Sequence, residues 1–100
     1  MESVYEAALA FELKKEGLHV RTQVSLPVIY ETEQLHLGFR IDILVNELVI
    51  IEVKSMEALH DVHHKQVLTY LKLSNKKLGI LVNFNTDNIS ASIIRKVNGL

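Results

Sequence analysis

The chain of 100 residues contains no cysteine and no tryptophan, a single proline and only four glycines. The absence of cysteine excludes a disulfide-stabilised scaffold and a zinc site with thiolate ligands. No apolar run approaches the ~20 residues that a membrane-spanning helix requires, and the opening Met1-Glu2-Ser3 does not begin a signal peptide. We therefore expect a cytoplasmic protein without membrane contacts.

Neither sign of charge is in excess, because 11 Lys and Arg stand against 12 Asp and Glu, for a formal net charge of −1. This balance provides no basic surface of the kind that binds nucleic acid tightly by itself. Hydrophobic residues make up 48% of the chain, which excludes a disordered segment and is enough for a modest core. The length predicts one domain over residues 1–100.

Two segments have the composition and spacing of helices. Residues 2–16 end at Gly17, where a helix C-terminus favours positive φ, and residues 59–74 end at Asn75-Lys76-Lys77. The expected buried positions are Val4, Leu9, Phe11, Leu13 and alanines 7, 8 and 10 in the first helix, and Val62, Val67, Leu68, Leu71 and Leu73 in the second. Since no capping residue precedes Glu2, we expect that an N-terminal helical segment is missing.

The other apolar segments have the pattern of strands. Pro27 predicts an edge or a bulge, because proline cannot donate to a ladder. The predicted strands are residues 19–32, 35–45, 48–54 and 78–82, with a loop over 83–88 and either a strand or a short helix over 89–97. The order helix, three strands, helix, strand indicates an α/β fold with a central mixed sheet flanked by helices.

The predicted hairpin around Asn46-Glu47 has one apolar and one charged face, since side chains alternate along a strand. The expected apolar face is Ile41, Ile43, Val45, Val49, Ile51 and Val53, and the opposite face contains Arg40, Asp42, Leu44, Ile50, Glu52 and Lys54. A two-residue turn would separate the two apolar sets, whereas a three-residue turn over 46–48, or a bulge, keeps them together. In that register Asp42 lies opposite Glu52, and Arg40 opposite Lys54.

Two hypotheses explain this charged face, because like charges opposed on a sheet are destabilising. In the first, the face is solvated and forms diagonal Asp42–Lys54 and Arg40–Glu52 ion pairs, which contribute about 0–1 kcal/mol each. In the second, the two carboxylates are ligands for a hard divalent cation such as Mg²⁺, and Lys54 holds a water or a phosphate oxygen. A metal ion and a lysine are suited to phosphodiester hydrolysis.

Asp42, nine intervening residues and then Glu52-Val53-Lys54 resemble the D…(D/E)-x-K motif of the PD-(D/E)XK nuclease superfamily. The α-β-β-β-α-β order resembles its restriction-endonuclease-like core. Glu2-Ser3-Val4-Tyr5 is similar to the end of the G-x-x-E-x-x-Y motif of a small branch of bacterial and archaeal members. Gln66 and Tyr70 are similar to the Q-x-x-x-Y of RecB-like nucleases.

The resemblance implies a nuclease that uses Mg²⁺ or Mn²⁺ to hydrolyse nucleic acid, with DNA as the expected substrate. It implies that Asp42, Glu52 and the Val53 carbonyl bind the metal and that Lys54 orients the water or stabilises the transition state. The superfamily commonly adds an acid from the first helix. Glu2 and Glu6 share a helix face at i and i+4, so both remain candidates.

Further candidate residues lie on the second helix and beside Asp42. The resemblance implies that Gln66 reaches Lys54 or the scissile phosphate and that His63 and Tyr70 line the substrate site, although plain helix packing also explains the spacing of Gln66 and Tyr70. Arg40 is either a phosphate clamp or a partner of Glu52. His60, His63 and His64 invite a zinc hypothesis, but zinc needs a fourth ligand, so a partly exposed helix N-terminus is favoured.

A different class of function remains open: a non-catalytic accessory, regulatory or nucleic-acid-binding module on a nuclease fold, or an interaction domain. Setting aside Lys54 and four site acids (Glu2, Glu6, Asp42 and Glu52) leaves 10 of 11 basic and 8 of 12 acidic residues, a balance of +2. The near-neutral total therefore does not exclude a nucleic-acid substrate. A homodimer or a partner protein would strengthen binding.

Overall fold

The computed structural model describes residues 1–85, 87 and 92–99 of the chain. Its elements are α1 (Glu2–Lys15), β1 (Val20–Ser25), β2 (Val28–Tyr30), β3 (Glu33–Leu35), β4 (Arg40–Val45), β5 (Val49–Lys54), α2 (Asp61–Ser74), β6 (Leu78–Asn83) and β7 (Ile93–Val97). Both predicted helices are confirmed, and the last segment forms a strand over Ile93–Val97. The predictions for 83–88 and 89–97 also cover residues 86 and 88–91, which lie outside the described residues.

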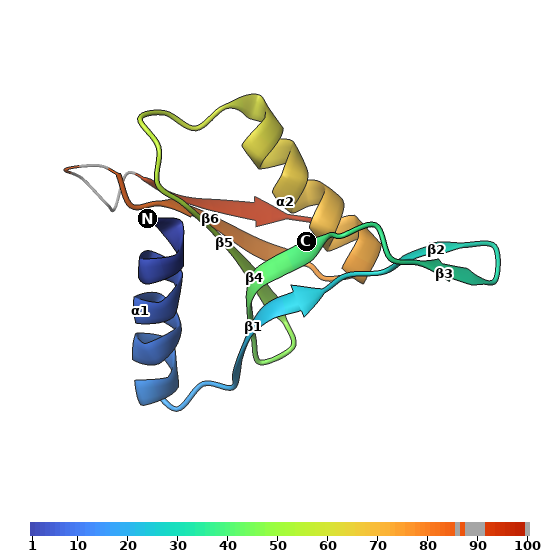
Figure 1. Ribbon diagram of the computed structural model, residues 1–100, viewed down its shortest axis with the longest axis horizontal. Helices are drawn as coiled ribbons and strands as arrows, with labels where there is room; N and C mark the ends of the chain where they lie inside the picture. Colours follow the sequence, from blue (N-terminus) through green and yellow to red (C-terminus); the bar gives the residue numbers. More distant parts are fainter. Residues whose placement is uncertain (86, 88–91, 100) are drawn as a thin grey trace.

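Five strands form one mixed sheet in the order β1-β4-β5-β6-β7. Strands β5 and β6 are parallel and are connected by α2, while the other neighbours pair antiparallel. The predicted α/β fold is confirmed, since α1, β1, β4, β5, α2 and β6 reproduce the expected core order. Strand β7 extends the sheet, and the two-stranded β2–β3 hairpin projects away from it (Figure 1).

Two of the predicted strands are too long, and each is divided in the structure. The segment 19–32 breaks between β1 and β2 at Pro27, which has no backbone N–H to donate. The preceding Leu26 donates its N–H to the Phe39 carbonyl at 2.9 Å instead. The segment 35–45 breaks at Gly38, whose φ of 82° turns the chain from β3 into β4.

The register predicted for a three-residue turn between β4 and β5 is confirmed. Val45 pairs with Val49, and the pairing continues to Ile43 and Ile51. Asn46 and Glu47 both have positive φ, at 53° and 57°, and the N–H of Leu48 donates to the Val45 carbonyl at 2.9 Å. Strand β5 therefore presents Ile51 and Glu52 to the sheet faces that the alternation predicted.

The helices cover opposite faces of the sheet, and each face has its own hydrophobic core (Figure 1). The α1 face buries Ala10, Ile43, Val45, Ile51, Val53 and Val82. The α2 face buries Leu26, Ile41, Leu44, Ile50, Val67, Tyr70, Leu71 and Leu81. The prediction that Ile41 shares a face with Ile43 is wrong, because the alternation along β4 is interrupted at the intervening Asp42.

Each helix buries a narrower stripe than predicted. On α1 only Ala10 is fully buried, and Phe11, about 100° further round the helix, is 60% exposed. On α2 the buried residues are Val67, Tyr70 and Leu71, whereas Val62 is 65% exposed. Val4 and Leu73 are also exposed, so their assignment to the core is wrong. No helix within the described residues is long and apolar enough to cross a membrane.

Candidate active site

Strands β4 and β5 separate just beyond the Ile43–Ile51 pair, and there two side chains accept the hydrogen bonds of backbone N–H groups. The Asp42 N–H donates to Glu52 Oε2 at 2.8 Å, and the Val53 N–H donates to Asp42 Oδ2 at 2.9 Å. Each carboxylate thus replaces a carbonyl oxygen of the opposite strand as the acceptor. The second oxygen of each carboxylate takes no part in these two bonds, which leaves it for another ligand.

Strand β1 is irregular at the same level of the sheet. Its pairing with β4 includes Thr22–Ile43 and Val24–Ile41 but omits Gln23 and Asp42, and Gln23 has a φ of 51°. The Gln23 side-chain amide donates to Glu6 Oε1 at 2.8 Å. Burial raises the pKa of Asp42, and hydrogen bonding by Gln23 partly offsets this shift. Gln23 is the site residue that sequence reasoning missed, because a glutamine in an alternating strand resembles any solvent-facing position.

Both candidate acids of α1 reach the site. Glu2 Oε2 accepts a hydrogen bond from the Ser55 N–H at 3.1 Å, just after β5, and Glu6 accepts the bond from Gln23. Burial is the main cause of the raised pKa values of Asp42 and Glu52; the negative charge of Glu2 adds to the first shift and that of Glu6 to the second. The structure therefore brings both glutamates together with the two strand acids, rather than selecting one.

Three of the site acids, Glu6, Asp42 and Glu52, have raised pKa values. Glu52 is only 2% exposed, and burial, followed by repulsion from Asp42, raises its pKa to about 8. Burial also raises the pKa of Asp42, although the Val53 N–H and the Lys54 ammonium oppose this shift. Burial and then the charge of Asp42 raise the pKa of Glu6. A bound cation would relieve this repulsion.

The donor set fits a hard divalent cation better than zinc. Among the described residues, no group of three or more His, Cys, Asp or Glu side chains is arranged to hold a metal ion. Asp42 and Glu52 provide only two carboxylates, so other ligands would have to come from the Val53 carbonyl, water or substrate. Mg²⁺ normally binds to one or two carboxylates while keeping several waters, which matches this set.

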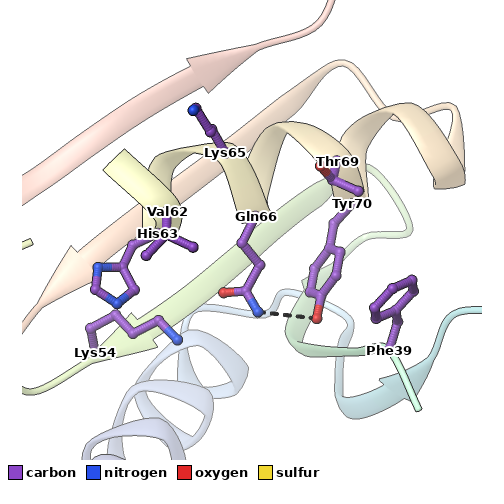
Figure 2. A pocket seen from close by; sticks show the side chains of 8 residues that line it. All are labelled: Phe39, Lys54, Val62, His63, Lys65, Gln66, Thr69 and Tyr70. Atoms are coloured by element: carbon purple, nitrogen blue, oxygen red, sulfur yellow. Dashed lines mark hydrogen bonds between the residues drawn. The ribbon is translucent and has the colours of Figure 1, made fainter. Parts of the chain in front are cut away.

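Lys54 lies at the end of β5, between the acids and a groove under α2. Burial raises the pKa of both Asp42 and Glu52, and the charge of Lys54 opposes this rise. The groove has a volume of about 480 Å³ and is lined by Phe39, Lys54, Val62, His63, Lys65, Gln66, Thr69 and Tyr70 (Figure 2). Three of the predicted site residues, His63, Gln66 and Tyr70, therefore line the same groove as Lys54.

Gln66 and Tyr70 form a pair on the wall of this groove. The Gln66 Nε2 donates to the Tyr70 hydroxyl oxygen at 3.3 Å, shown dashed in Figure 2. Tyr70 is buried, and burial together with the charge of Glu52 raises its pKa. The Gln66–Tyr70 contact agrees with packing along the helix, while the position of both residues beside Lys54 also suits the predicted substrate contact.

The histidines at the start of α2 close its first turn. The His60 N–H donates to His63 Nδ1 at 3.0 Å, which satisfies a backbone donor at the helix N-terminus. This bond occupies one ring nitrogen of His63 and leaves Nε2 directed elsewhere. Burial, followed by the charge of Lys54, lowers the pKa of His63, which favours the neutral imidazole.

The diagonal ion pairs of the solvated-face hypothesis do not form. In the described part of the chain, the ion pairs of lysine and arginine are Lys15–Glu12 and Arg21–Glu47, and His19 Nε2 lies 3.8 Å from Glu47 Oε2. Neither Arg40 and Glu52 nor Asp42 and Lys54 are paired, and Arg40 is exposed. The strand acids bond to backbone N–H groups instead, so this face is a built polar site and not a layer of surface ion pairs.

Residues 1–96 match the PD-(D/E)XK nuclease superfamily, and the chain belongs to that superfamily. A solved structure described as the crystal structure of SSO0001 shares the fold, with a TM-score of 0.71, 24% sequence identity and 99% of this chain covered. The chain spans about half of that protein, 51% of its length. No curated protein matches the chain significantly.

We predict that replacing Gln23 by alanine raises the pKa of Glu6 further above its ordinary value. The hydrogen bond from Gln23 lowers this pKa in the wild type, so its loss leaves burial and the charge of Asp42 unopposed. NMR titration of the side-chain carboxyl carbons measures the change. Gln34→Ala, on the exposed strand β3, is the matched control. An unchanged Glu6 pKa in Gln23→Ala would show that the amide does not position this acid.

We also predict that Glu52 makes the protein less stable as pH rises. Its carboxyl ionises near pH 4.5 in the unfolded chain but near pH 8 in the folded protein. The folded state therefore binds more protons between these values, and the free energy of unfolding falls as pH rises through this window. Glu52→Gln removes the effect, so it should stabilise the protein by about 2–4 kcal/mol at pH 9 and by little at pH 4.

Urea unfolding of both proteins at pH 4 and pH 9 measures this difference. Glu33→Gln, an exposed position on β3, should leave the stability within ~0.5 kcal/mol at both pH values. If Glu52→Gln changes stability equally at pH 4 and pH 9, Glu52 does not titrate as an acid with a raised pKa.

Proposed function

We propose that this protein is a divalent-metal-dependent nuclease that hydrolyses phosphodiester bonds at the Asp42–Glu52–Lys54 site. Membership of the nuclease superfamily supports the class of reaction. The observation that supports the site most directly is the pair of carboxylate–backbone bonds that fix Asp42 and Glu52 where β4 and β5 separate. These bonds keep two acids, one of them buried, beside a lysine. A neutral amide oxygen could accept the same backbone bonds, so the sheet does not require these two side chains to be charged.

Mg²⁺ or Mn²⁺ is the proposed cofactor, with Asp42, Glu52 and the Val53 carbonyl as its ligands. When bound, such an ion supplies Lewis-acid polarisation of a phosphate oxygen and lowers the pKa of water. The buried, mutually repelling acids are consistent with this role, since a cation would stabilise the ionised form of both carboxyls.

The protein's own residues would perform the remaining steps. Lys54 is proposed to stabilise the extra negative charge that develops on the phosphate as water attacks phosphorus and the P–O bond breaks. Glu6, with its raised pKa and its bond from Gln23, is the proposed acceptor of a proton from that water. Glu2, which accepts the Ser55 N–H, would hold the end of β5 in place.

The proposed substrate is nucleic acid, with DNA tested first. Arg40, exposed at the start of β4, is proposed to contact a phosphate. A second copy of the chain or a partner protein is proposed to extend the binding surface. A non-catalytic module on the same fold would bind nucleic acid without cleaving it, and the same experiment separates the two functions.

We predict that Asp42→Asn and Lys54→Ala each reduce Mn²⁺-dependent cleavage at least about 100-fold, because each removes charge that acts on the transition state. Cleavage of single-stranded, duplex and branched DNA, and of RNA, is measured by gel electrophoresis. Lys14→Ala, exposed at the far end of α1, is the control and should keep wild-type activity. Circular dichroism establishes that each variant is folded.

Two results would contradict the proposal. One is a folded wild-type protein that binds no Mn²⁺ by calorimetry and cleaves none of these substrates. The other is a Lys54→Ala variant with full activity. Binding of nucleic acid without cleavage would indicate the accessory module instead.

A further inference from the structure

The surroundings of Lys54 are electrostatically asymmetric. The acids Glu2 and Glu6 approach the site from α1, whereas the groove on the α2 side of Lys54 is lined by the cationic Lys65 and by His63, which favours its neutral form. Phosphate groups are repelled by the first side and attracted by the second. A nucleic-acid strand with its scissile phosphate at Lys54 would therefore continue along the α2 groove.

The groove is larger and more apolar than phosphate binding alone requires. Its volume is about 480 Å³, and its walls include the aromatic rings of Phe39 and Tyr70, whose centroids are 5.9 Å apart. Val62 projects from the first turn of α2 into this lining and is 65% exposed, although it makes no contribution to the core. The rings of Phe39 and Tyr70 are tilted by 50° at one end of the groove, and Val62 lies beside His63 at the other end (Figure 2). An apolar lining with an aromatic ring suits a nucleobase, whose stacking on aromatic rings does not depend on base identity.

Polar groups at the edge of the groove are free to recognise such a base. Gln66 uses one amide hydrogen on the Tyr70 hydroxyl, and among the described residues its carbonyl oxygen has no partner. Its unused donor and acceptor match the hydrogen-bonding edge of an unpaired base. His63, whose Nδ1 accepts the His60 N–H, has Nε2–H available as a donor in its neutral form.

We propose that this groove is a subsite for one unpaired nucleotide next to the scissile phosphate, with its base against Phe39 and Val62. The proposal rests on the nuclease function above and narrows its substrate to single strands or unpaired regions of nucleic acid. A base inside a duplex is stacked and paired, so it must be flipped out before it can enter a side pocket. An unpaired base enters without that cost, and the groove therefore selects unpaired substrates.

The test measures binding by a non-cleaving form of the full chain, Asp42→Asn, using fluorescein-labelled oligothymidylate of twelve nucleotides and the same strand annealed to its complement. We expect the single strand to bind at least tenfold more tightly than the duplex. Adding Val62→Ser should weaken single-strand binding at least threefold and duplex binding by less than twofold. Serine is polar but uncharged, so it removes the apolar contact without repelling phosphate.

The matched control is Leu48→Ser, at a turn residue that is 66% exposed at the opposite end of the β4–β5 hairpin. NMR spectra provide a second measurement: thymidine 5′-monophosphate should shift the amide signals of Val62 and Thr69, and inorganic phosphate should not. Equal affinity for duplex and single strand, or equal effects of Val62→Ser and Leu48→Ser, would overturn the subsite. The subsite would also be overturned if inorganic phosphate alone shifted the amide signals of Val62 and Thr69 as much as thymidine 5′-monophosphate does.

Failure of the nuclease function is recognised separately. If the wild type cleaves duplex and single strands equally with Mn²⁺, and Val62→Ser has no effect, the subsite is wrong and the nuclease function stands. If base-dependent binding is found but no cleavage occurs under any condition, the subsite is supported and the nuclease function is wrong.

Discussion

Two reciprocal hydrogen bonds between β4 and β5 connect the fold of this protein to its candidate chemistry. Where the strands separate, the Asp42 N–H and the Val53 N–H lose their usual carbonyl partners and bond to Glu52 and Asp42. Buried backbone donors without an acceptor are costly, so the two carboxylates are fixed by the requirements of the sheet itself. Burial, followed by repulsion from Asp42, raises the pKa of Glu52 to about 8, although the bond from the Asp42 N–H opposes this shift.

The rest of the site is organised around this separation of the strands. Ile41 turns to the α2 core although Ile43 packs on the α1 core, and Gln23 adopts a positive φ beside Asp42. A left-handed conformation at a residue other than glycine costs about 1–3 kcal/mol and is common at functional sites. Here it accompanies a side-chain amide bonded to Glu6, so the distortion of β1 coincides with the positioning of an acid from α1.

Much of the fold could be predicted because local signals and periodicity agreed with the tertiary structure. Gly17 and Asn75 mark the helix ends with positive φ, and the alternation of apolar residues determined the β4–β5 register. The exposure of Val62 and the position of Ile41 could not be predicted. Both depend on where a helix or strand meets its neighbour, and periodicity within one segment contains no information about that. The same alternation of side chains placed Asp42, Glu52 and Lys54 on one face of the predicted hairpin. The role of Gln23 could not be predicted, because nothing in the sequence indicates a positive φ at a glutamine.

The most direct test of the account is a crystal structure of the wild-type protein grown with Mn²⁺, with anomalous diffraction measured at the manganese absorption edge. The account predicts an anomalous peak in contact with carboxylate oxygens of both Asp42 and Glu52, with the Asp42 and Val53 N–H bonds to the two carboxylates retained. The absence of a peak there at saturating Mn²⁺, in a crystal where both carboxylates are well ordered, would contradict it.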